Sequence, residues 1–397
     1  MAVLKLVSGT GMALLLAIAS LSAEAAPACE QTATWVAPAS GDTPELQEVL
    51  RRLDDKQVVL LGETHTRADH HQWQLHMLAA LQARRGAVAV GFESFPRAAQ
   101  PVLDRWVADE LSVPEFLQQT DWRRVWNFDA DLYLPLFEFA RMYRLPMLAM
   151  NVESALVRRI GREGWEAIPE SERAGLGDPA PIGEAYEDFL WSVFQSHPAR
   201  DGAGSRDAAD RGDPAFRRFV QVQQTWDRAM AEAIAGALQT APERPVVGIL
   251  GMGHVQERWG VPHQLAAMGI DKVAVLLPWT SGQECETLTA SVADAVFMMR
   301  APPEGAAGPP PPRLGILIVD SKDPSGVRVS GVSASSVAEA AGLKKDDVIV
   351  NAAGTAVTQV RALIAIVQRQ APGTWLPLAV QRGDERIDLV AKFPSAP

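Results

Sequence analysis

Polar or titratable side chains follow four of the five β-strands that the sequence predicts in its first 280 residues. They are Glu63 with His65, Glu93, Asn151 and His254. Ligands of parallel sheets bind beyond the carboxyl ends of the strands, so side chains at these ends face one common region. Glutamate is depleted in strands and is costly to bury unpaired. We therefore predict a shared ligand, metal or proton-transfer site of Glu63, His65, Glu93 and His254.

Two other interpretations of these side chains stay open. In the first, each glutamate only caps the following helix or pairs with a local arginine, such as Arg67 or Arg97. In the second, the chain is a hydrolase with Glu63 or Glu93 as general base, while His65 and His254 orient water. His65, Glu93 and His254 would also suit a divalent metal, since two imidazoles and a carboxylate are common zinc ligands.

The elements that must position these residues alternate along the chain. Runs that are apolar on both faces predict strands at 57–62, 87–93, 146–151, 245–251 and 272–278, and amphipathic runs predict helices at 69–84, 97–108, 131–143, 153–160, 183–195 and 214–238. This alternation predicts an α/β fold, a mostly parallel sheet flanked by helices. Gly62, Gly91, Gly251 and Gly253 lie at the strand ends and allow close backbone approach to a ligand. The sequence contains no nucleophile elbow, P-loop, zinc helix or complete dinucleotide fingerprint.

Composition excludes several classes of protein. The 397 residues are 47% apolar and carry a formal net charge of -11, which is unlike a nucleic-acid binder. No apolar run reaches the roughly 18–20 residues of a membrane span, so a multi-span membrane protein is excluded. Residues 1–25 have a basic start, a short apolar run and an A-x-A pattern, which together predict a signal peptide and export to the periplasm or envelope.

The two cysteines leave three alternatives. Cys29 follows the predicted signal and would anchor the chain to a membrane if it were lipidated as in a bacterial lipoprotein. It would instead form a disulfide with Cys285, which an oxidising compartment permits. Both would otherwise be free thiols. Peripheral membrane association and a homodimer also stay open.

The chain divides at a segment rich in proline and glycine. Residues 301–312 predict a semi-rigid linker between a domain at 30–300 and a smaller module at 313–394. Residues 198–215 are polar and rich in glycine and aspartate, so we expect a surface loop there.

The larger domain resembles the ChaN-like haem-binding family, which belongs to a superfamily with Tiki, TraB and erythromycin esterase-like proteins. The resemblance rests on several motifs in order. They are Leu61-Gly62-Glu63-Thr64-His65 with His70-His71, Gly91-Phe92-Glu93, the stretch 126–140, 148–151, the stretch 224–231, and Gly251-Met252-Gly253-His254-Val255. It implies an exported haem-binding protein with a role in haem or iron uptake.

Haem requires an apolar slot, an axial ligand and cations for its propionates. The resemblance implies cofactor contacts from the motif residues, with the axial ligand left open. The candidate contacts are Glu63, His65, His71, Glu93, Tyr133, Met252 and His254. Haem binding is the favoured function, and a metal-dependent hydrolase and an envelope scaffold are the alternatives.

The module at 313–394 resembles a PDZ domain of the HtrA type. The likeness begins at Arg313-Leu314-Gly315-Ile316, which is similar to a carboxylate-binding loop, and continues through 338–343 and 346–349. It implies a small β-rich domain that binds a protein C-terminus as an added strand, with Leu314, Gly315 and Ile316 at the peptide.

Overall fold

The computed structural model describes residues 28–196, 210–281, 287–301, 312–371 and 373–394. The predicted signal peptide, Cys285 and most of the predicted loop and linker lie outside these ranges. The chain forms two compact units, Met1–Ala301 and Pro302–Pro397, which are described separately. Among the helices of the described ranges, none has the length and apolar character to cross a bilayer.

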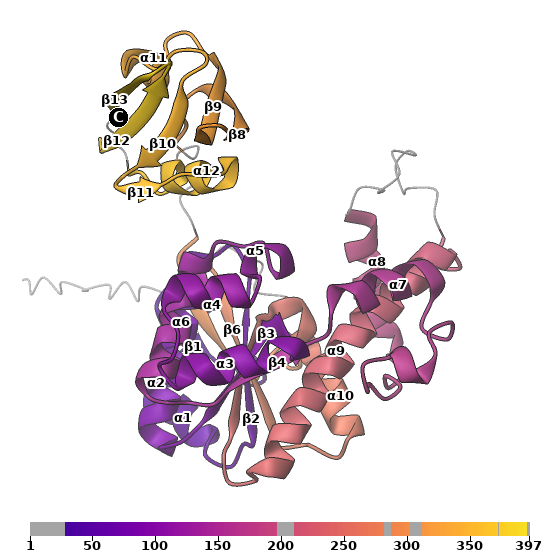
Figure 1. Cartoon of the computed structure of the whole chain (residues 1–397). Coiled ribbons are helices and arrows are strands. Elements are labelled where there is room, and N and C mark those ends of the chain that lie inside the picture. The colour runs from indigo at the N-terminus through magenta and orange to yellow at the C-terminus, as the bar shows by residue number, and fades with distance from the viewer. Residues whose placement is uncertain (1–27, 197–209, 282–286, 302–311, 372, 395–397) are drawn as a thin grey trace, which may run out of the picture. The chain divides into compact units, whose positions relative to one another are not determined.

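The first unit is built on a seven-stranded sheet, counted over the described residues, with the order β1-β7-β6-β2-β5-β3-β4 (Figure 1). Neighbouring strands are parallel except for β1 and β7, which are antiparallel. The predicted mostly parallel α/β sheet is therefore confirmed. The strands are β1 Thr34–Val36, β2 Val58–Glu63, β3 Ala89–Pro96, β4 Met147–Asn151, β5 Val246–Gly251, β6 Val273–Thr280 and β7 Ala295–Met299.

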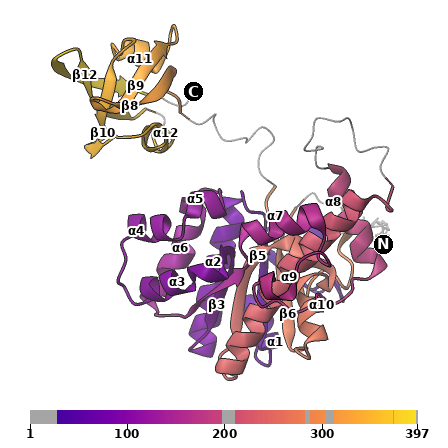
Figure 2. The same ribbon diagram turned by 45° about the vertical axis from the view of Figure 1, so that its right-hand side comes forward.

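Helices cover both faces of this sheet, which is why its central strands are apolar on both sides. In β2, Val59 and Leu61 pack with α1 to α6, whereas Val58 and Leu60 pack with α9 and α10. Figures 1 and 2 show the two helical layers on either side of the strands. The helices are α1 Leu46–Arg52, α2 Ala68–Arg85, α3 Gln100–Val107, α4 Val113–Gln119, α5 Trp122–Val125, α6 Ala130–Met142, α7 Ser154–Glu163, α8 Glu184–Ser196, α9 Pro214–Thr240 and α10 Val261–Ala267.

The N-termini of α6 and α9 are capped by aspartates, which fixes where each helix begins and therefore which of its side chains face the sheet. Asp129 caps α6, its carboxylate accepting the Asp131 N–H at 3.1 Å. Asp213 caps α9 in the same way through the Ala215 N–H at 2.7 Å, with Pro214 in the first turn. An acceptor at the cap and a proline just inside it favour helix initiation.

The second unit is an antiparallel sheet with the strand order β13-β12-β10-β9-β8, in which β11 pairs with β10 (Figure 1). Its core comes from alternate strand residues such as Val327, Ile349 and Leu378, closed by Leu363 of α12. The elements are β8 Ile316–Lys322, β9 Ser325–Val332, α11 Val337–Ala340, β10 Val348–Ala352, β11 Thr355–Ala356, α12 Val360–Gln368, β12 Trp375–Arg382 and β13 Glu385–Lys392.

A buried ion pair stabilises the sheet of the second unit. The Asp347 side chain is fully buried and accepts hydrogen bonds from Arg382 Nε at 2.7 Å and from the Lys344 N–H at 2.8 Å. Burial alone would raise the pKa of Asp347, but these hydrogen bonds hold it below its ordinary value. The resulting stabilisation is complete above the unfolded-state pKa of about 3.9 and is lost as the pH falls through the lower folded-state pKa.

We expect Asp347→Asn to lower the free energy of unfolding of this unit by about 2 kcal/mol at neutral pH, because a buried charge-assisted network loses its acceptor. Hydrogen exchange of the β10 and β12 amides in the full chain measures the loss. Asp388→Asn, at an exposed position of β13, is the control. Equal protection in the two variants would show that the Asp347 pair adds nothing to stability.

Candidate functional site

The structure brings the predicted strand-end residues together at the carboxyl edge of the sheet. β5 lies between β2 and β3, and Glu63 at the end of β2 pairs in register with Gly251 at the end of β5. Glu93 lies in β3, and His254 follows β5 in a short 3-10 helix, Met252–His254. Parallel strands thus place side chains that are far apart in sequence on one edge.

Glu63 is the centre of the first group of side chains. Its Oε1 accepts the His65 ring N–H at 2.5 Å (Nδ1) and the Tyr133 hydroxyl at 3.3 Å. His71 is buried behind them, with Nε2 3.2 Å from the His65 carbonyl and Nδ1 3.1 Å from Gln74 Oε1. A carboxylate only accepts hydrogen bonds, so His65 carries its proton on Nδ1.

His254 is the centre of the second group. Its Nδ1 lies 2.6 Å from Asp227 Oδ1 on α9, and its Nε2 lies 3.4 Å from Glu93 Oε1. The second Asp227 oxygen accepts the Tyr186 hydroxyl of α8 at 2.9 Å, and Glu93 Oε2 accepts the Gly251 N–H at 2.7 Å. The result is one imidazole between two buried carboxylates.

The charges in this second group stabilise one another. Burial alone would lower the pKa of His254, but the charges of Glu93 and Asp227 raise it well above its usual value. Burial would likewise raise the pKa of Glu93, but His254, His65 and the Gly251 N–H lower it to about 2. His254 is therefore an imidazolium at neutral pH and Glu93 is a carboxylate.

Gly251 lets the two groups approach each other. A Cβ at this position would lie 2.9 Å from His65 Cε1 and 3.5 Å from Glu93 Oε2. Gly62 and Gly91 also meet close neighbours, the Leu277 and Met150 side chains. Gly253 has nothing within 4 Å of its added Cβ, so its side of the turn is open. Gly62, Gly91 and Gly251 thus pack against side chains of the chain itself, and their approach to a ligand stays a prediction.

A cavity of about 300 Å³ opens between the two groups. His65 and His254 line it together with Glu93 and Ser94 from β3, and with Trp126 and Trp226. The His65 ring lies edge-on to Trp126, with 4.8 Å between ring centroids, and 5.0 Å from Phe128. The Ser94 hydroxyl is buried and has no hydrogen-bond partner. The cavity thus combines aromatic walls with imidazole and unsatisfied polar groups.

Other predicted residues do not line the cavity. Tyr133 is 2% exposed, and burial followed by the charge of Glu63 raises the pKa of its hydroxyl far above the usual range. Met252 packs against the apolar cluster beneath α9 and α10. In the part of the chain that the structure describes, no three His, Cys, Asp or Glu side chains are arranged to hold a metal ion. The metal alternative therefore finds no support.

Sequence reasoning missed Asp227 and Tyr186 as site residues. Asp227 is fully buried on α9, inside a motif that carried the family resemblance but had no role assigned to it. The sequence did contain one indication of its role, because Asp227 is an acidic residue on the apolar face of a long predicted helix. An unpaired charge is too costly to bury there, so a buried partner was to be expected. Gly260, with φ of 58°, packs so closely on Asp227 that a Cβ would lie 2.8 Å from Oδ1.

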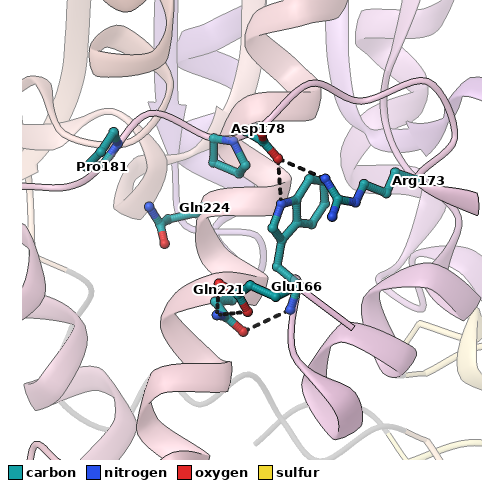
Figure 3. A pocket seen from close by; sticks show the side chains of 8 residues that line it. Glu166, Arg173, Asp178, Pro181, Gln221 and Gln224 are labelled. Atoms are coloured by element: carbon teal, nitrogen blue, oxygen red, sulfur yellow. Dashed lines mark hydrogen bonds and ion pairs between the residues drawn. The ribbon is translucent and has the colours of Figure 1, made fainter. Parts of the chain in front are cut away.

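A larger cavity, of about 570 Å³, lies between the segment that follows α7 and helix α9 (Figure 3). Its polar groups already bind one another. Asp178 accepts from Trp165 Nε1 and from Arg173, each at 2.9 Å, and Gln221 donates to Glu166. The cavity is not at the sheet edge, and none of the strand-end residues line it. We therefore assign the site to the smaller cavity.

The comparisons with known proteins agree with this fold. The family model described as "Haem-binding uptake, Tiki superfamily, ChaN" matches residues 49–265, more than half of the chain, so the chain belongs to this haem-binding family. A PDZ-domain model matches residues 312–392. Both resemblances seen in the sequence are thereby confirmed. No curated protein matches the chain in sequence.

Solved structures are similar to each unit. The structure described as "Cofacial heme binding to ChaN of Campylobacter jejuni" has a TM-score of 0.53 and 17% identity, and the match covers 66% of this chain and 95% of that chain. An HtrA3 PDZ domain bound to a phage-derived ligand is 24% identical with a TM-score of 0.19, covering 20% of this chain and 82% of that chain. A serine endoprotease from Yersinia pestis is 25% identical with a TM-score of 0.19, covering 21% and 29%.

The glycine geometry yields a matched pair of variants. In Gly251→Ala the added methyl group would lie 2.9 Å from His65 Cε1, so the His65 ring must shift. We therefore expect haem affinity to fall about tenfold, which is roughly 1.4 kcal/mol. Gly253→Ala has open space for its methyl group and should bind haem like the parent chain. Soret titration of both variants measures the difference. Unchanged affinity in Gly251→Ala would show that the close approach of His65 is irrelevant to binding.

Proposed function

We propose that this chain is an exported haem-binding protein of the bacterial cell envelope that handles haem in iron uptake, and that its PDZ domain recruits a protein by its C-terminus. The observation that carries the proposal is the cavity at the carboxyl edge of the sheet, in a chain of the ChaN family. Bound haem would supply an iron centre that accepts an electron pair from a protein side chain.

The residues of the cavity fit haem. Trp126, Trp226 and the neighbouring Phe128 offer aromatic surface, and His65 offers an imidazole. Arg124 lines the rim as an exposed cation, although it also pairs with Asp121. The unpartnered Ser94 hydroxyl is a further polar group that a bound ligand would satisfy.

The size of the cavity indicates an open site. Pockets that enclose a drug-sized ligand range from about 300 to 1,000 Å³, and this cavity is at the lower end of that range. It would hold part of the macrocycle and leave the rest uncovered. The relative from Campylobacter jejuni is described as binding haem cofacially. In a homodimer, a second copy of this chain would cover the part of the macrocycle that the cavity leaves exposed.

Export is the second part of the proposal, and it rests on the signal-like residues 1–25. Cys29 is 7% exposed and packs in the apolar cluster beneath α9 and α10. A buried side chain favours a bond inside the fold over an acyl chain in a membrane. We therefore favour the Cys29–Cys285 disulfide over a lipid anchor, and Cys285 lies outside the described residues.

The PDZ part of the proposal rests on an accessible strand. β8 is an edge of its sheet and bears the exposed apolar side chains Leu317 and Val319. α12 packs beside it and exposes Ile364. The loop before β8 turns at Gly315, where φ is 77°. An edge strand, an adjacent helix and a glycine loop suit a peptide C-terminus that adds as a strand.

The haem site is tested by blocking the cavity. Ser154 lines the cavity at the start of α7, whereas its neighbour Ala155 is exposed and does not line it. We expect the parent chain to bind haem saturably, and we expect Ser154→Trp to weaken binding at least tenfold while Ala155→Trp leaves it unchanged. Soret titration with far-UV circular dichroism measures both. Absence of saturable binding by the parent chain would refute the proposed function.

The proposed peptide site is tested by comparing two variants that each introduce a glutamate, one beside β8 and one at the opposite edge of the sheet. Ile364→Glu places a carboxylate on α12 next to the edge strand β8, so a peptide with an apolar C-terminus should bind at least tenfold more weakly. Val390→Glu changes a similarly exposed residue of β13, at the opposite edge of the sheet, and should bind normally. Fluorescence anisotropy with a peptide library measures both. Equal affinity of the two variants would place peptide binding elsewhere.

A further inference from the structure

We propose that the PDZ domain selects its partner by the residues at positions −1 and −3 as well as by the last residue, and that Leu317 and Val319 make this selection by favouring apolar side chains there. Positions are counted back from the last residue of the peptide, which is position 0. The inference rests on the PDZ part of the proposed function and names the kind of peptide that this site takes. It is carried by β8, an edge strand with apolar side chains on both faces.

The two faces of β8 have different surroundings, because alternate side chains of a strand point to opposite sides of the sheet. Ile316 and Ile318 pack against the core of the domain, which includes Leu363 of α12. Leu317 and Val319 point the other way and are 69% and 49% exposed. Within the second unit, the outer face of this edge strand is therefore apolar and open to solvent.

The opposite edge of the same sheet has the ordinary character of a protein surface. The exposed side chains of β13 are mostly charged, and they are Glu385, Arg386, Asp388, Val390 and Lys392. Charges on an edge strand oppose pairing with another chain, whereas an apolar edge favours it. β8 carries no charge over residues 316–319, so this edge is suited to pairing with an added strand.

The direction of the added strand follows from the position of the glycine loop. Gly315 comes immediately before the first residue of β8, so a peptide whose carboxylate lies at this loop must be antiparallel to β8. Position 0 is then opposite Ile316. Since opposite residues of paired strands share a face, position −1 lies beside Leu317 and position −3 beside Val319. The side chains at 0 and −2 point toward α12 instead.

The neighbouring strand β9 leaves both apolar side chains uncovered. Leu317 is opposite Gly331, where an added Cβ would lie 3.3 Å from Leu317 Cδ1, so the leucine lies close over a residue that has no side chain. Val319 is opposite Arg328, but the Arg328 guanidinium is directed to Ser321 Oγ at 3.3 Å. An apolar surface therefore remains beside the free edge of β8 for the −1 and −3 side chains.

The partner that fits is a protein whose last four residues are all apolar. The side chains at 0 and −2 would pack on the side of α12, where Ile364 is 39% exposed, while those at −1 and −3 would cover Leu317 and Val319. Removal of each apolar surface from water favours binding. A C-terminus in which apolar and polar residues alternate would match only one of the two faces and would bind more weakly.

The test is fluorescence anisotropy of the full chain with two labelled decapeptides. Both have valine at 0 and −2, and they differ in having either leucine or serine at −1 and −3. We expect the parent chain to bind the leucine peptide at least about tenfold more tightly, because only this peptide buries apolar surface on the outer face. The double variant Leu317→Ser/Val319→Ser should bind the two peptides within about threefold of each other, because its outer face is polar.

Val390→Ser is the matched control, since Val390 is 42% exposed on β13 at the opposite edge of the sheet. This variant should keep the preference of the parent chain for the leucine peptide. A preference that persists in the double variant overturns the role of Leu317 and Val319. Far-UV circular dichroism of all three chains checks that each is folded.

The remaining outcomes separate this inference from the function on which it rests. Equal binding of the two peptides by the parent chain overturns the inference and leaves the peptide-binding function intact. Equal binding together with self-association that the double variant loses in sedimentation overturns it in favour of a second copy on this face. Binding of neither peptide by the parent chain overturns the PDZ part of the proposed function and this inference together.

Discussion

The two ion pairs of His254 are the interaction on which the rest of the first unit's site depends. They connect β3 through Glu93, α9 through Asp227 and, by way of Tyr186, α8. None of these charges is tolerable alone in a buried position, so each requires the others. The helices α8 and α9 are consequently tied to the edge of the sheet by charge as well as by apolar contacts. The cavity exists because this network holds its wall in one arrangement.

The ion pairs of His254 distinguish it from His65, although the two histidines lie in similar sequence contexts. His65 and His254 both follow a glycine-containing strand end, and residue type alone makes them equivalent ligands. Their partners make them different, since His254 meets two carboxylates and His65 meets one. Burial lowers the pKa of both rings, but the carboxylates raise it overall, and they raise the pKa of His254 well above its ordinary value. The number of carboxylates around each histidine is decided by tertiary packing, and that number sets how strongly the pKa of the ring is raised.

The sequence was sufficient for the parts of the fold that repeat a local pattern. Runs such as 57–62 and 245–251 are apolar on both faces, which was enough to predict strands there. The ends of the predicted strands pointed to Glu63, Glu93 and His254. It could not supply Asp227 or Tyr186, because their roles depend on helices packing beside a strand end far away in the chain. The short edge strand β1 and its neighbour β7 were missed for a similar reason, since short strands are defined by their pairing partners. The cavity lining from Trp126 and Ser154 is likewise a product of tertiary packing.

A buried, paired carboxylate does not by itself mark a functional site, and the two units of this chain demonstrate it. Asp347 and Glu93 both have a pKa below the ordinary value because cations and N–H groups surround them. Asp347 pairs with Arg382 within the second unit, and it lines neither of the two cavities described above. Glu93 pairs with His254 in the wall of a cavity that is also lined by Ser94, whose hydroxyl has no hydrogen-bond partner. Perturbed titration indicates function only where open space and an unused donor or acceptor accompany it.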